Sequence, residues 1–90
     1  MGFNLSPTEN HVNILKHAFE SKEIEIWDDY PDEDDSDYHH FKICSGLTTY
    51  NIQVVPRNNS FVYEITHGYR FEVIEKFHEL FNYIKNTRQS

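Results

Sequence analysis

The sequence is poor in several residue types, and each shortage excludes a class of protein. Its single cysteine, Cys44, cannot form an intramolecular disulfide, which favours a reducing compartment. Lysine and arginine number eight against fifteen aspartates and glutamates, which gives a net charge of −7 at pH 7. Phosphate backbones and anionic membranes repel so acidic a chain, so we do not expect it to bind nucleic acid or lipid directly. No apolar stretch approaches the ~18 residues that span a bilayer.

Aromatic residues, by contrast, are plentiful at 16% of the chain, with seven phenylalanines, six tyrosines and one tryptophan. Disordered chains are poor in aromatics, so this one is expected to fold. Its 90 residues are enough for one small domain, and we expect residues 1–90 to form a single acidic domain with a thin core. The first residues lack the basic and apolar regions of a secretory signal, so we expect a cytoplasmic protein.

The charge is concentrated in one block. The stretch from Glu20 to Asp37 contains ten acids and one base, so its charge is −9, whereas the remaining five acids and seven bases sum to +2. Seven acids and a proline fall within residues 28–37. Because like charges repel, this run predicts an exposed loop.

The hydrophobic pattern predicts an α+β fold with the order α-β-β-β-β-α. Residues 6–21 carry an S-x-x-E capping box with a proline at the first helical position, and residues 70–86 carry the clearest helical stripe, centred on Phe77. Alternation of period two predicts strands over 23–28, 38–44, 48–55 and 61–65. A four-stranded antiparallel sheet with both helices packed on one face would bury every apolar stripe.

The sequence offers no convincing metal or catalytic site. The acidic run does not match an EF-hand, because the twelfth position is Ile43 when counted from Asp32. Adjacent strand residues such as His39 and His40 point to opposite faces, which disfavours a shared zinc ion. No basic cluster activates the Cys44 thiol, and the carboxylates lie in a solvated run. We therefore expect no enzyme, no cofactor and no metal.

The acidic block remains the best candidate for a functional surface. If extended, its ten residues from Asp28 to Asp37 would span ~33 Å, with one charge per ~5 Å against one per ~3.4 Å along a DNA strand. Such a surface can compete for the phosphate-binding groove of a nuclease or another DNA-binding protein, and the alternative is a merely solubilising loop. The predicted partner-binding residues are Glu23, Glu25, Asp28, Asp29, Asp32, Glu33, Asp34, Asp35 and Asp37.

Two resemblances bear on this hypothesis. In size, in the block from Glu23 to Asp37 and in its aromatic-rich remainder, the chain resembles the small acidic inhibitors that phages make against host nucleases, such as the anti-restriction-nuclease proteins of T-even phages. That resemblance implies a DNA mimic. Residues 61–64 and 77–85 resemble the last strand and second helix of an SH2 domain. Trp27 stands where that family has its phosphotyrosine-binding arginine, so the alternative is a protein-interaction module without phosphotyrosine binding.

A homodimer is expected if the chain mimics DNA. A twofold axis would present two acidic blocks and would match the symmetry of many dimeric DNA-binding proteins. Aromatic and aliphatic residues on the polar faces of strands are the natural interface anchors. The candidates are Trp27, Val55 and Val62.

Overall fold

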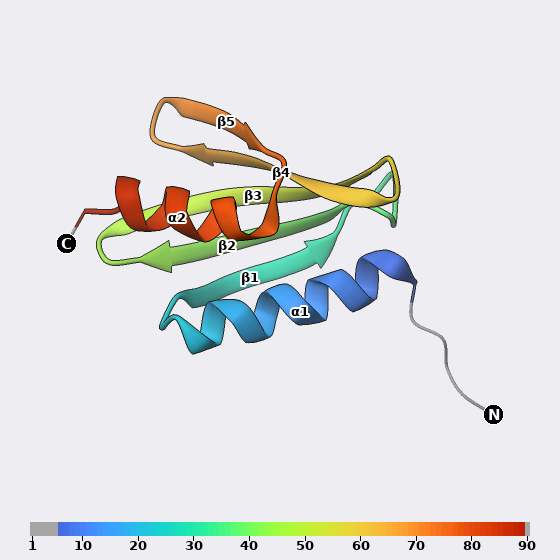
Figure 1. Cartoon of the computed structure of the whole chain (residues 1–90), viewed down its shortest axis with the longest axis horizontal. Coiled ribbons are helices and arrows are strands. Elements are labelled where there is room, and N and C mark those ends of the chain that lie inside the picture. The colour runs from blue at the N-terminus through green and yellow to red at the C-terminus, as the bar shows by residue number, and fades with distance from the viewer. Residues whose placement is uncertain (1–5, 90) are drawn as a thin grey trace.

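The structure is a computed structural model that describes residues 6–89, and it has an α+β architecture (Figure 1). The N-terminal residues on which the signal-sequence expectation rests lie mostly outside this range. Neither helix within residues 6–89 is long and apolar enough to cross a membrane. The elements, in chain order, are α1 (Pro7–Ser21), β1 (Glu25–Pro31), β2 (His39–Ser45), β3 (Thr48–Arg57), β4 (Ser60–His67), β5 (Arg70–Ile74) and α2 (Phe77–Thr87).

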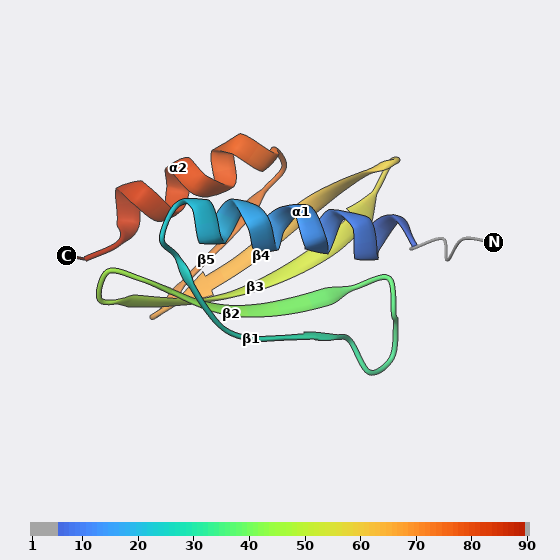
Figure 2. The same ribbon diagram turned by 90° about the horizontal axis from the view of Figure 1, so that it is seen from below.

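The five strands form one antiparallel sheet in the order β1-β2-β3-β4-β5, so each strand pairs with its neighbour in the sequence. Both helices lie on the same face of this sheet, and no element of the described chain covers the other face (Figure 2). Strands β1 and β5 are the two edges. The predicted class, the antiparallel pairing and the placement of the helices are confirmed.

The number of strands is a correction. Residues 70–86, predicted as one helix, divide into the edge strand β5 and the shorter helix α2. Gly68, with φ at +59°, lies in the two-residue loop between the paired residues His67 and Arg70, and a glycine at the first loop position is typical of type II′ hairpins. The hairpin turns the chain back onto β4, and the helix begins only at Phe77.

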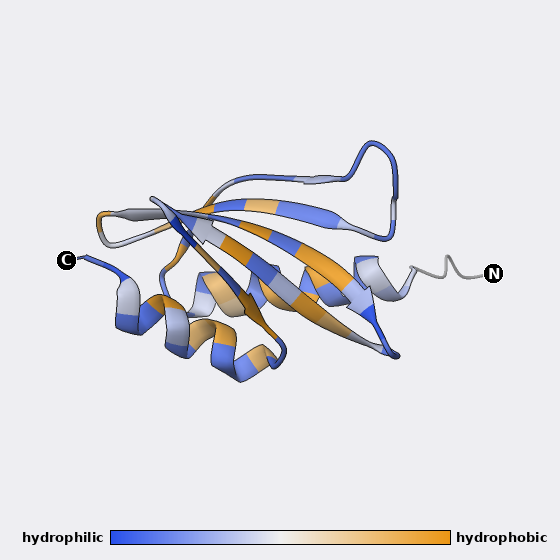
Figure 3. Ribbon diagram, turned by 90° about the horizontal axis from the view of Figure 1, so that it is seen from above, coloured by the Kyte–Doolittle hydropathy of each residue, from blue (hydrophilic) through white to orange (hydrophobic). Residues whose placement is uncertain are grey.

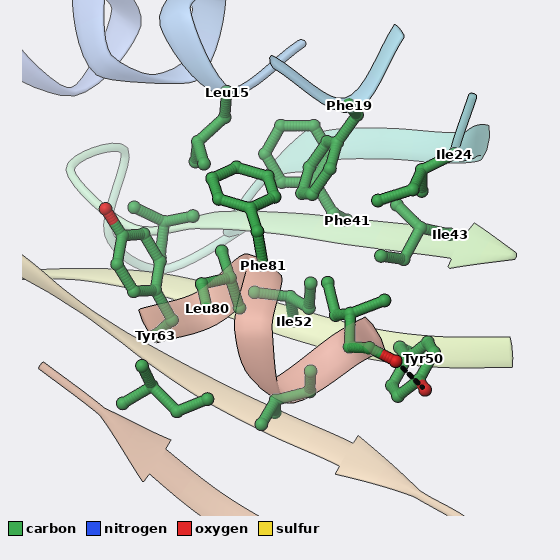
Figure 4. Packing of buried hydrophobic residues seen from close by; sticks show 14 of the residues in the cluster. Leu15, Phe19, Ile24, Phe41, Ile43, Tyr50, Ile52, Tyr63, Leu80 and Phe81 are labelled. Atoms are coloured by element: carbon green, nitrogen blue, oxygen red, sulfur yellow. Dashed lines mark hydrogen bonds between the residues drawn. The ribbon is translucent and has the colours of Figure 1, made fainter. Parts of the chain in front are cut away.

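The core fills the space between the helices and the covered sheet face. Phe19 of α1 meets Phe41 of β2 and Phe81 of α2 edge to face, with ring centroids 5.5 and 5.6 Å apart (Figure 4). Hydrophobic and hydrophilic residues alternate along β2, β3 and β4 (Figure 3), and alternate residues of these strands are buried in the core. Phe77 is only partly buried, so the centre of the α2 stripe is Leu80, Phe81 and Ile84 instead.

Candidate functional site: the acidic edge

The nine predicted partner-binding acids follow one edge of the sheet and the loop that continues it, and we call them the acidic edge. Glu25, Asp28 and Asp29 belong to β1, whose seven residues span ~23 Å. Glu23 lies in the turn before the strand, and the other five lie in the β1–β2 loop. Seven of the nine are exposed, and Asp29 and Asp32 are half-buried. Strand β1 therefore holds part of the charge on backbone that is paired with β2.

The two half-buried acids are joined to bases on neighbouring elements. Asp29 Oδ1 lies 3.2 Å from Lys16 Nζ of α1 and 3.0 Å from His39 Nε2 of β2. Asp32 Oδ1 lies 2.7 Å from His40 Nε2, and this hydrogen bond, aided by two backbone amides, lowers the pKa of Asp32. These contacts fix the start of the loop against the sheet.

The run 28–37, predicted as one exposed loop, is divided in the structure: residues 28–31 belong to β1, and only residues 32–38 form the β1–β2 loop. This loop is largely exposed, and its own acids give it a defined conformation. The Asp32 carboxylate accepts hydrogen bonds from the amides of Asp34 and Asp35, and Asp35 accepts one from the amide of Asp37. The Thr8 hydroxyl of α1 also donates to the Asp37 carbonyl at 2.9 Å. The amide of Asp32 also donates to the Tyr38 carbonyl at 2.9 Å, so the loop folds back on itself and its charges lie closer together than in an extended chain.

His39 and His40 point to opposite sides of β2, as their strand positions predicted. Each bonds a different aspartate, Asp29 and Asp32 respectively. Within residues 6–89 no group of three or more histidine, cysteine or acidic side chains is arranged to hold a metal ion. The half-buried Cys44 thiol donates to the Gly46 carbonyl at 3.5 Å.

The three candidates for a dimer interface differ in accessibility. Trp27 is 55% exposed and lies at an irregularity of β1, between Ile26 and Asp28, where the register with β2 shifts. Val55 is half-buried, and its cross-strand partner Val62 is only 6% exposed. Trp27 therefore offers far more surface to a partner than either valine.

Sequence reasoning missed a second surface, which lies on the uncovered face of the sheet. There a shallow trough of about 520 Å³ crosses all five strands. Its signal in the sequence was the set of polar positions between the core residues of each strand, which are usually attributed to solvation. The side chains on this face that line the trough are Asp28, Tyr30, His40, Lys42, Asn51, Gln53, Glu64, Thr66 and Phe71.

Two histidine–tyrosine pairs occupy the helix side of the sheet. His11 of α1 hydrogen-bonds the Tyr63 hydroxyl and stacks on Phe61 with ring centroids 4.3 Å apart. Burial lowers the pKa of His11 and raises the pKa of Tyr63 to about 12, so burial favours the neutral form of both side chains. His67 forms the equivalent bond to Tyr83 at 2.7 Å. Both pairs connect a helix to the sheet, and we assign them a structural role.

Comparison of the chain with models of protein families, with curated proteins and with solved structures gives no match. The functional argument therefore depends on the surfaces just described.

Proposed function

We propose that the protein is a non-enzymatic inhibitor that acts as a DNA mimic, occupying the basic nucleic-acid-binding groove of a nuclease or another DNA-binding protein. The observation that carries this proposal is the acidic edge, where seven exposed carboxylates follow one sheet edge and its loop. A basic groove that normally binds phosphates gains the same release of counterions when it binds fixed carboxylates.

The ordered loop strengthens this proposal over a merely solubilising role. A flexible acidic segment loses conformational freedom when it binds, which costs about 1–2 kcal/mol per residue that becomes fixed. Here the bonds of Asp32, Asp35 and Thr8 already fix the loop in the free protein. The charges are thus presented without most of that cost, as preorganised binding surfaces require.

A second candidate is a general interaction module that binds through aromatic side chains. Tyr30 and Phe71 favour it, because they are 49% and 59% exposed on the uncovered sheet face. Exposed aromatic residues are frequent anchors of protein interfaces. The binding affinity of such a module would depend far less on ionic strength than the affinity of a DNA mimic does.

The test begins with partners captured on the immobilised protein at about 50 mM salt. We expect elution between about 50 and 200 mM salt, a linear fall of log K with log salt, and displacement by duplex DNA. A partner that stays bound under saturating duplex DNA, or whose affinity does not change with salt concentration, would overturn the DNA-mimic proposal and favour the aromatic module.

Matched charge variants locate the binding surface. Asp28→Asn, Glu33→Gln and Asp34→Asn together remove three exposed charges of the acidic edge. The control removes three exposed charges elsewhere, through substitution of Gln for Glu72, Glu75 and Glu79. We expect the first variant to weaken binding at least about tenfold more than the control. Equal losses of affinity in the two variants would mean that binding depends only on net charge and not on the acidic edge.

A further inference from the structure

The trough on the uncovered face is built from two rows of side chains that cross the sheet. Cross-strand pairing places Asp28, Lys42, Asn51, Thr66 and Phe71 in one row. The neighbouring row consists of Tyr30, His40, Gln53, Glu64 and, beyond the trough lining, Val73. Cross-strand partners in an antiparallel sheet share a face, so these side chains form one continuous surface. At ~4.8 Å between strands, the surface is ~19 Å wide.

Aromatic rings stand at the two ends of this surface. Tyr30 is on the edge strand β1 and stacks on His40, with ring centroids 5.0 Å apart, while Phe71 is on the opposite edge strand β5. Both rings keep about half of their surface exposed. A planar group that lies against either ring would therefore find an apolar face beside a polar floor.

The floor between the rings carries two carboxylates, Asp28 and Glu64, against one lysine. The carboxylates of Asp28 and Glu64 form no ion pair with any residue in 6–89. The amide side chains of Asn51 and Gln53 lie between them and add two carbonyl oxygens together with two NH2 groups. Lys42 is the one lysine or arginine of the lining, and it is the cross-strand neighbour of Asp28.

These groups discriminate among ligand classes. A phosphate would face the carboxylates of Asp28 and Glu64, and a hydrocarbon would leave the polar floor without hydrogen bonds. A guanidinium group has five N–H donors and no acceptor, carries a positive charge, and stacks on aromatic rings. It therefore suits acidic and carbonyl acceptors that are flanked by exposed rings.

We propose that the trough binds arginine side chains of the protein's basic partner. This rests on the proposed function for the nature of the partner, and it extends the contact surface beyond the acidic edge. Asp28 lies on β1 and also lines the trough, so the two surfaces are continuous. A partner that the acidic edge attracts can thus place a further arginine beside Glu64 and Phe71 across the sheet.

The test uses peptides and therefore does not require the partner. The backbone amide spectrum of the ¹⁵N-labelled protein is recorded during titration with hexa-arginine and with hexa-lysine. We expect hexa-arginine to shift the amide signals of β3, β4 and β5 and to bind at least about threefold tighter than hexa-lysine, because the guanidinium group adds stacking and bidentate bonds. Equal affinities, or shifts confined to β1 and its loop, would overturn the proposal.

Variants connect the shifts to particular side chains. Glu64→Gln and Phe71→Ala should each reduce the preference for arginine, whereas Tyr69→Ala should not, since Tyr69 is fully exposed in the β4–β5 loop and lies outside the trough. The uncharged sugar maltohexaose is the third probe. If it alone perturbs the trough amides, the site takes a polyhydroxylated ligand and the arginine assignment is wrong.

The outcomes separate this inference from the proposed function. If the trough prefers arginine but duplex DNA fails to displace the partner, the DNA-mimic proposal fails and the trough remains. If duplex DNA displaces the partner while arginine and lysine peptides bind alike, the trough proposal fails and the mimic remains.

Discussion

Phe19 provides the sharpest test of how the domain is held together. Its side chain is fully buried, and it joins three elements because its ring packs against Phe41 of β2 and Phe81 of α2. Replacement by alanine removes the ring and both aromatic contacts. We expect Phe19→Ala to cost about 3–5 kcal/mol of unfolding free energy, toward the upper end because each lost aromatic pair adds ~0.5–1.5 kcal/mol.

That loss is large for so small a domain. At roughly 0.05–0.15 kcal/mol per residue, a chain of this length has a total stability of about 5–13 kcal/mol. Urea unfolding followed by far-ultraviolet circular dichroism is the appropriate assay, because the only tryptophan, Trp27, is 55% exposed and would report poorly on the core. Phe19→Leu, expected to cost about 1–2 kcal/mol, keeps the test usable if the alanine variant is unfolded.

Two further variants complete the test. Ile14→Ala, on the same helix but 55% exposed, should change stability by no more than about 0.5 kcal/mol. Phe77→Ala should cost about 1–2 kcal/mol, because Phe77 is only half-buried at the start of α2 and does not lie at the centre of a longer helix. If Phe19→Ala costs no more than Ile14→Ala, the assignment of the core is refuted.

Three other predictions concern pH, the loop and assembly. Burial lowers the folded-state pKa values of His11 and His67, so the unfolded chain binds more protons than the folded chain as the pH falls through 6.5. The free energy of unfolding should therefore drop between about pH 7.5 and 5.5. The accompanying drop in urea midpoint should be smaller for His11→Gln than for the wild-type protein. An equal drop in both proteins would contradict this account. Glu33→Gln with Asp34→Asn should leave the midpoint unchanged or slightly raised at low salt, whereas Asp32→Ala should lower it because it removes the bonds that order the loop. Sedimentation equilibrium at tens of micromolar should give a mass of twice 10.8 kDa, with tighter association at higher salt. A monomer at both salt concentrations would contradict the dimer.

The sequence predicted well where local chemistry decides the structure. The capping box at Ser6 and Glu9 forms as expected, with each side chain accepting a hydrogen bond from the other residue's amide. The three central strands lie within two residues of their predicted bounds at every end, because their apolar positions alternate without ambiguity. Burial on one face fixes the register of such strands.

The prediction failed where two periodicities overlap. Val73, Ile74 and Phe77 have helical spacing, yet Phe71 and Val73 also alternate as in a strand, and pairing with β4 decides in favour of the strand. Gly68 was the local signal that could have revealed the hairpin. The bonds of Asp29 and Asp32 to histidines on β2 could not be predicted, because they depend on the register of β1 against β2.

The simple order of the strands has a consequence for how the chain folds. Every hairpin connects sequence neighbours, and such hairpins form within about 1–10 μs. The contact between Phe19 and Phe81, by contrast, joins helices 62 positions apart (81 minus 19), so it closes a long loop and should form late. Until both helices dock, the apolar face of the nascent sheet is open to other chains. The net charge of −7 then slows aggregation, because partly folded molecules repel one another and meet less often.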